Sequence, residues 1–177
     1  MPTPATGDRQ IFRWVWLLDD RLRQFTNVMA IIGIAFLILA VTVVVGDIVW
    51  RRIGGGSFIG AIDLTQFSVM AAVSWSIPYV FSVGGHVRVD LLSGWFNNAI
   101  KRVLDCIAYL IGAGMSGFLC WLSSKRGMEI WTYGDVSQDL AIPMIWFWAF
   151  LISGLAISTL VCLVRASRIA VDTGFGD

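Results

Sequence analysis

The stretch that decides the fold is QFTNVMAIIGIAFLILAVTVVVG, residues 24–46, which contains no Asp, Glu, Lys, Arg or His. A helix needs about 20 predominantly apolar residues to cross the hydrocarbon core of a bilayer. A single Asp or Arg at the centre of such a helix would cost roughly 2.5–3.5 kcal/mol on insertion scales. Residues 24–46 are therefore expected to form a membrane-spanning helix.

Three further stretches are equally free of charge: Leu64–Gly85, Cys106–Ser124 and Leu140–Val164. One apolar stretch could be a buried helix of a soluble protein, but four of this length indicate repeated membrane crossing. Of the whole chain, 57% is hydrophobic and 14% is charged, against about 45–50% and about 25% in soluble domains. We predict an all-α integral membrane protein with one membrane domain, residues 1–177. Its four spans are expected at about 25–47, 64–85, 104–125 and 140–164.

Two segments beside the spans have amphipathic helical patterns. Apolar residues recur every three or four positions in Ile11–Phe25, and four-residue apolar pairs occur in His86–Phe96. Such patterns are typical of helices that lie in the headgroup plane. We therefore predict interfacial helices within residues 1–24 and at residues 86–98. Each could simply fix the depth of the adjacent span, or it could provide a surface on which helices of another subunit rest.

The orientation follows from the Lys and Arg residues in the connections, because cytoplasmic loops carry an excess of them. With a cytoplasmic N-terminus, nine lie on the cytoplasmic side, namely Arg9, Arg13, Arg21, Arg23, Arg88, Lys101, Arg102, Arg165 and Arg168. The other four are Arg51, Arg52, Lys125 and Arg126. Both termini are therefore predicted to be cytoplasmic, with residues 165–177 as a tail. We expect no cleaved signal peptide, because the first apolar stretch exceeds the usual core of about 7–15 residues.

Residues that could carry catalysis or hold a cofactor are few. His86 is the only histidine, so a bis-histidine haem or a histidine-based zinc site is not supported within this chain. The three cysteines lie in apolar stretches without Cys-x-x-Cys spacing, and Gly54–Gly56 lacks the Gly-Lys-Ser/Thr ending of a phosphate loop. The net charge of +1 gives no indication of nucleic-acid binding. We expect neither enzymatic activity nor a bound cofactor or metal.

The acidic residues lie at the ends of the predicted spans rather than in their middle, where a transport pathway would need them. Asp63 opens the second span and is expected either to face the positive end of the helix dipole or to contact a partner subunit. Pro78 is expected to kink the second span, and Pro143 is expected in the first turn of the fourth. One kink and no intramembrane charge argue against an ion pathway in this chain.

Small residues recur at four-residue spacing in the third and fourth spans. Such ridges allow the backbones of two helices to approach closely in lipid. They are Ala108, Gly112 and Ser116, with Ala113 and Gly117, and then Ala149, Ser153, Gly154 and Ser158. They could pack the four helices of this chain together, or pack against another chain.

Three local motifs resemble the small membrane subunit of tripartite ATP-independent periplasmic (TRAP) transporters. They are Gly60–Leu64 (GAIDL), Gly85–Leu92 (GHVRVDLL) and Ser137–Met144 (SQDLAIPM). The second is the most specific, whereas in the first an Asp replaces the more usual Glu of the family. The resemblance extends over roughly Gly33 to Arg165.

The resemblance implies a non-catalytic subunit in the inner membrane of a bacterium. In such transporters a periplasmic binding protein captures the substrate, often a small organic acid, and a large multispanning permease imports it with a sodium gradient. The small subunit braces the permease. The resemblance makes Asp63, His86, Arg88, Asp90 and Pro143 candidate contacts with the partner subunits or with membrane lipid. The segment Trp131–Leu140 is a further candidate on the periplasmic side.

Three other functions stay open from the residues alone. The chain could be an independent small oligomeric transporter or channel, which the lack of intramembrane charge disfavours. It could anchor a soluble enzyme complex, although it lacks the ligands for haem. A membrane-embedded enzyme would need a catalytic constellation that the sequence does not show.

Overall fold

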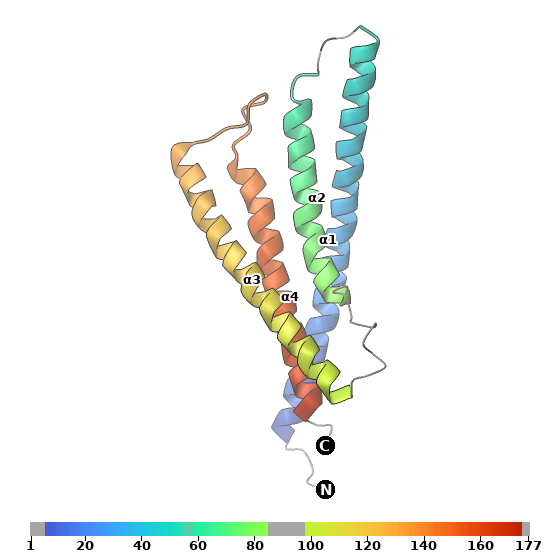
Figure 1. Cartoon of the computed structure of the whole chain (residues 1–177), viewed down its shortest axis with the longest axis vertical. Coiled ribbons are helices and arrows are strands. Elements are labelled where there is room, and N and C mark those ends of the chain that lie inside the picture. Colours follow the sequence, from blue (N-terminus) through green and yellow to red (C-terminus); the bar gives the residue numbers. More distant parts are fainter. Residues whose placement is uncertain (1–5, 55, 57, 85–97, 175–177) are drawn as a thin grey trace.

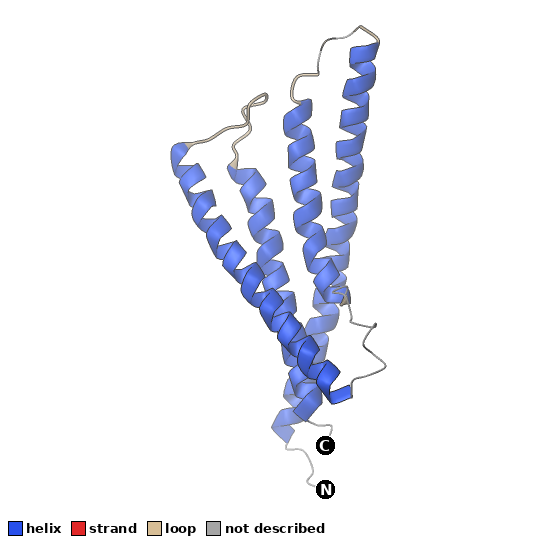
Figure 2. Cartoon of the chain, in the orientation of Figure 1, coloured by secondary structure: helices blue, strands red, loops and turns tan. Residues whose placement is uncertain are grey.

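The structure is a computed structural model that describes residues 6–54, 56, 58–84 and 98–174. In this part of the chain four helices follow one another, as Figure 1 and Figure 2 show. They are α1 (Thr6–Arg52), α2 (Ala61–Val83), α3 (Asn98–Tyr133) and α4 (Ile145–Gly174). Each contains a segment long and apolar enough to cross a membrane. The prediction of an all-helical chain with four such segments is confirmed.

The helices form two antiparallel pairs that come together at the end of the bundle where both termini lie (Figure 1). Helix α1 packs along α2, and α3 packs along α4. The two pairs are joined mainly through α2 and α4, with a smaller contact between α1 and α4. Among the described residues, the backbone of α3 closely approaches that of α4 alone. Helix α4 is thus the central element of the fold.

Burial in this bundle is the reverse of burial in a water-soluble protein. Many of the buried residues are small, such as Ala71, Ser74 and Cys162, whereas large apolar side chains such as Ile38 and Ile111 are more than 60% exposed. Water would not tolerate such continuous apolar faces, but lipid or another membrane protein covers them without cost. The pattern agrees with helices that cross a membrane.

Helices α2 and α4 come closest where Ser74 faces Gly154. Proline has no N–H, so Pro78 cannot donate the helical hydrogen bond that the carbonyl of Ser74 would otherwise accept. A Cβ atom built on Gly154 would lie only 2.2 Å from that carbonyl oxygen. Only a glycine therefore permits this approach. Of the small residues of α4 that the sequence singles out, Ser153 and Gly154 therefore contact the protein's own α2.

An aromatic cluster fills the space between α1, α2 and α4. It lies between the contact of Ser74 with Gly154 and the loop that joins α3 to α4. Phe36 of α1 lies with its ring centroid 6.4 Å from Phe67 and 6.1 Å from Phe150, both edge-on. Trp75 of α2 packs against Phe150 at 5.0 Å and donates a hydrogen bond from Nε1 to Ser153 Oγ (3.2 Å). Edge-to-face pairs of this kind are favourable beyond their apolar burial. The cluster therefore packs three helices against one another, and the indole N–H of Trp75 is hydrogen-bonded within the chain.

The structure differs from the sequence-based expectation at the start of the first helix. Residues 11–25 are helical, but they continue without a break into the span as part of α1. No Gly or Pro occurs between Ile11 and Ile32 to interrupt the helix. The chain therefore extends the first span instead of forming a separate element before it. At the other terminus α4 also stays helical well past residue 165, to Gly174.

The fourth helix begins later than expected. Residues 140–144 form a loop, and α4 starts at Ile145. Pro143 is therefore not in the first turn of a helix; it lies before it, in an antiparallel β-bridge with Val136. The physical reason is a set of hydrogen bonds that holds this loop to α2. The predicted interfacial helix at residues 86–98 lies outside the described residues, except for Asn98, which begins α3.

Candidate functional sites at the two ends of the bundle

Two clusters of polar groups, one at each end of the bundle, join separate helices or a helix and a loop. We call the set Asp63, Ser137, Asp139 and Leu140 the loop junction. We call a second set the terminal junction, because it joins the N-terminal part of α1 to the C-terminal parts of α2 and α4. It consists of Trp16, Asp19, Thr26, Ser82, Arg165 and Arg168.

The loop junction is built on one carboxylate oxygen. Oδ2 of Asp63 accepts hydrogen bonds from Ser137 Oγ (2.6 Å), from the Leu140 amide (2.7 Å) and from the Asp139 amide (3.1 Å). The residue is only 2% exposed. Hydrogen bonds to an ionised acceptor are stronger than those between neutral groups. Asp63 thereby ties the first turn of α2 to the loop between α3 and α4.

The loop itself is shaped to reach that carboxylate. Ser137 donates its amide to the carbonyl of Ile142 (2.9 Å), and Ile142 donates its amide back to Ser137 Oγ (3.0 Å). Ala141 adopts a φ of 51°, in the left-handed region that few residues other than glycine occupy. Leu140 lies directly on Gly60, where an added Cβ would come within 2.6 Å of the leucine side chain. A glycine is needed at position 60 for this contact, and its own φ of 90° requires one as well.

The structure places Asp63 in the first turn of α2, as the sequence predicts. The residue that caps the helix is Gly60, and it has no side chain for capping. The Asp63 carboxylate is buried against its own loop, so its effect on any partner subunit would pass through that loop. Pro143, in contrast, is exposed. His86, Arg88 and Asp90 lie outside the described residues.

We expect the Asp63→Ala variant to release the loop between α3 and α4. The substitution removes the acceptor of three donors, one of them the buried hydroxyl of Ser137. Amide hydrogen exchange at Asp139 and Leu140 should become faster by roughly tenfold, because the local opening loses at least one net hydrogen bond. Asp139→Ala is the matched control, since that side chain is exposed and only its backbone takes part. Unchanged exchange at Leu140 in Asp63→Ala would show that the loop is held by other contacts.

The terminal junction is centred on a buried acid in α1. Asp19 is 4% exposed and forms ion pairs with two arginines of α4, at 3.0 Å to Arg165 Nε and through its other oxygen to Arg168. The guanidinium of Arg168 also stacks over the ring of Trp16, 3.5 Å from the ring centroid. A carboxylate between two guanidinium groups is held in place by charge and by directional hydrogen bonds. The extension of α1 before the first apolar stretch is thus fixed to the extension of α4 after the last one.

Helix α2 joins the same junction through Ser82. Arg165 donates a hydrogen bond to the carbonyl oxygen of Ser82, and Thr26 of α1 donates from Oγ1 to Ser82 Oγ (3.0 Å). Thr26 and Ser82 are almost completely buried. The three helices α1, α2 and α4 are therefore locked together at the end where the two pairs meet.

Sequence reasoning did not find this junction, although a signal was present. Asp19 and Thr26 are seven residues apart and so lie on one face of α1. An acid on that face matches the two arginines of α4, which are three residues apart and also share a face.

The two junctions position the helices and the loop between α3 and α4 relative to one another. In the described ranges no group of three or more His, Cys, Asp or Glu residues could hold a metal ion. The charged side chains of the described residues lie in the helices on either side of the four uncharged stretches or in the loops, and none lies within these stretches. The fold and its two junctions define a multi-pass α-helical membrane protein.

Residues 40–171 match the family model described as tripartite ATP-independent periplasmic transporters, DctQ component. Because the match covers well over half of the chain, the protein belongs to this family of small TRAP transporter subunits. The resemblance inferred from the three local motifs is confirmed. Comparisons with curated proteins and with solved structures each gave no match.

Proposed function

We propose that this chain is a non-catalytic scaffold for the large permease subunit of a TRAP transporter. The observation that carries the proposal is the match to the family over residues 40–171. The permease would import a small organic acid, delivered by a periplasmic binding protein and driven by a sodium gradient. The assembly would lie in the bacterial inner membrane, with both termini of this chain in the cytoplasm.

The interior of the bundle favours a scaffold function for this chain rather than the function of an independent channel. The middle of the described bundle holds the aromatic cluster of Phe36, Phe67 and Phe150 and the hydrogen bond between Trp75 and Ser153, and no charged group. A pathway for ions would need charged or polar groups near the bilayer midplane. The substrate and ion sites would therefore belong to the large permease.

Two exposed faces are available to that permease, one on α1 and one on α3. These helices lie on the two sides of the bundle (Figure 1), and each presents a long apolar surface. The last turn of α3, just before the loop held by Asp63, is exposed as well, with Trp131 at 68% and Tyr133 at 79% exposed. We propose that this loop, with Pro143, contributes contacts at the periplasmic end. His86, Arg88 and Asp90 are proposed to contact the permease or lipid headgroups at the cytoplasmic end.

The test is purification of the tagged chain from its native membranes in mild detergent, with the bound proteins identified by mass spectrometry. A large multispanning permease in equal amount is expected. A photoreactive amino acid placed at Ile38 of α1 or at Ile111 of α3 should crosslink to it from at least one position, since these side chains are 63% and 64% exposed. Photoreactive groups at Ala71 or Cys162, which are fully buried, provide the negative control.

Purification of the chain alone, or with a soluble enzyme, would contradict the scaffold and favour a channel or an anchor. In the same assay the triple variant His86→Ala, Arg88→Ala, Asp90→Ala should retain less permease. If that variant assembles and transports normally, these three residues have no role in assembly.

A further inference from the structure

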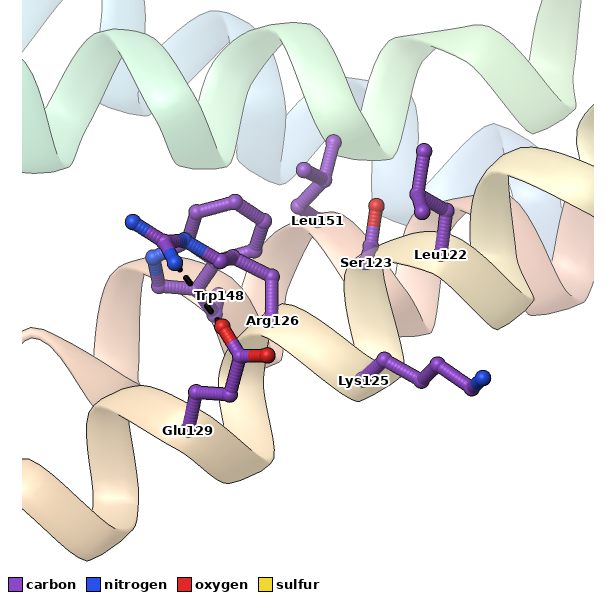
Figure 3. Close-up of a pocket in the computed structure, with 7 residues that line it drawn as sticks. All are labelled: Leu122, Ser123, Lys125, Arg126, Glu129, Trp148 and Leu151. Carbon is purple, nitrogen blue, oxygen red and sulfur yellow. Dashed lines mark hydrogen bonds and ion pairs between the residues drawn. The ribbon is translucent and has the colours of Figure 1, made fainter.

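We propose that a groove between α3 and α4, at the end of the bundle opposite the termini, binds an anionic phospholipid. The groove has a volume of about 490 Å³ and is drawn in Figure 3. This inference requires only that the helices cross a membrane, and it is independent of the scaffold role proposed above.

The floor of the groove is apolar. It is formed by Leu122 of α3 and by Trp148 and Leu151 of α4. Next to the groove α3 packs closely on α4 at Gly127, where an added Cβ would lie 3.3 Å from Ile152 Cδ1 and 3.7 Å from Trp148 Cβ. A floor of this composition fits the upper part of an acyl chain.

The rim of the groove carries charge. Lys125, Arg126 and Glu129 line it, so two positive groups and one negative group leave a net charge of +1. Arg126 Nη1 is paired with Glu129 Oε2 at 2.8 Å. In Figure 3 the side chain of Lys125 extends away from that pair along α3. Its ammonium lies 4.1 Å from the ring centroid of Trp121, and no carboxylate of the described residues forms an ion pair with it.

The depth of the groove places this charge at the level of the headgroups. The uncharged stretch of α3 ends at Ser124, immediately before Lys125. On the facing helix, Trp148 lies in the first turn of α4 after its start at Ile145. Tryptophan and snorkelling lysine side chains are characteristic of the membrane–water boundary. An anionic phospholipid could place its phosphate at Lys125 on the rim and an acyl chain over Leu122 and Leu151 on the floor. A small soluble anion would contact only the charged rim.

The test compares lipid retention by Lys125→Gln with that by the unsubstituted chain. Each chain is purified with its bound partners from native membranes, and phosphatidylglycerol per chain is quantified by mass spectrometry. Loss of the Lys125 ammonium should reduce the retained phosphatidylglycerol about fivefold. Lys125→Arg should restore retention. Arg52→Gln is the matched control, because it removes an exposed cation at the same end of the bundle, outside the groove.

A second measurement uses nanodiscs made with phosphatidylcholine alone or with added phosphatidylglycerol. The anionic lipid should raise the thermal midpoint of the unsubstituted chain and of Arg52→Gln, but not that of Lys125→Gln. Equal retention and equal midpoints in Lys125→Gln would overturn the proposal. Unchanged lipid with loss of a copurifying membrane protein would also overturn it, because the groove would then hold an acidic group of that protein.

Discussion

Replacing Gly154 with alanine is expected to force α4 away from α2 and to destabilise the chain strongly. The new Cβ would lie 2.2 Å from the carbonyl oxygen of Ser74 and 2.7 Å from its carbonyl carbon. Both atoms belong to the helix backbone, so no side-chain rotation can relieve the clash. Overpacking typically costs about 1–3 kcal/mol, and a clash with backbone should reach the upper end of that range.

The measurement is the midpoint of unfolding in a mixed detergent titrated with a denaturing detergent, followed by the fluorescence of tryptophan. Two other helical glycines provide matched controls. Gly117→Ala meets only ordinary contacts, at 3.5 Å from Thr159, and should be nearly neutral. Gly114→Ala meets nothing within 4 Å and should stabilise α3 by about 0.5–1 kcal/mol through its higher helix propensity. If all three substitutions shift the midpoint equally, the close approach of α2 and α4 does not set the stability.

The substitution Asp19→Asn is expected to open the terminal junction. It keeps the size of the side chain but removes the charge that compensates Arg165 and Arg168, whose side chains are only 19% and 21% exposed. Removing one partner of a buried ion pair costs about 3–5 kcal/mol, and we expect about 2–3 kcal/mol here because both arginines keep some access to water. The two helix pairs meet at this end of the bundle. Loss of the ion pairs of Asp19 should therefore weaken the packing of one pair against the other.

Asp20→Asn is the matched control, since Asp20 is the next residue in the same helix but is exposed. It should leave the unfolding midpoint unchanged within about 0.5 kcal/mol. A double-mutant cycle of Asp19→Asn with Arg168→Gln should show a coupling free energy of about 1–2 kcal/mol. Strictly additive effects would mean that the ion pair contributes nothing as a pair.

Much of the fold could be predicted from short stretches of sequence. The four uncharged stretches were enough to predict four membrane helices, because the length and polarity of a span are properties of consecutive residues. The family could be predicted in the same way from GAIDL, GHVRVDLL and SQDLAIPM, which are also local. The cytoplasmic position of the termini stays a prediction, since the structure contains no membrane; it shows only that both termini lie at one end.

The late start of α4 came from a contact between distant residues. Leu140–Val164 is a continuous uncharged stretch, and nothing within it separates Leu140 from the helix that follows. The Leu140 amide is drawn out of the helix by Asp63, a residue 77 positions earlier in the chain. Helix propensity is a weak preference that such a hydrogen bond overrides.

The partners of the buried polar groups could not be predicted from the sequence either, because these partners are also distant in the chain. Asp19 binds Arg168 from 149 positions away, and the carbonyl of Ser74 is open to Gly154 only because Pro78 withholds a donor. Each of these contacts depends on how two helices rotate and approach one another. A pattern of apolar and polar residues identifies the face that a helix buries, but the groups that meet on that face are determined by packing.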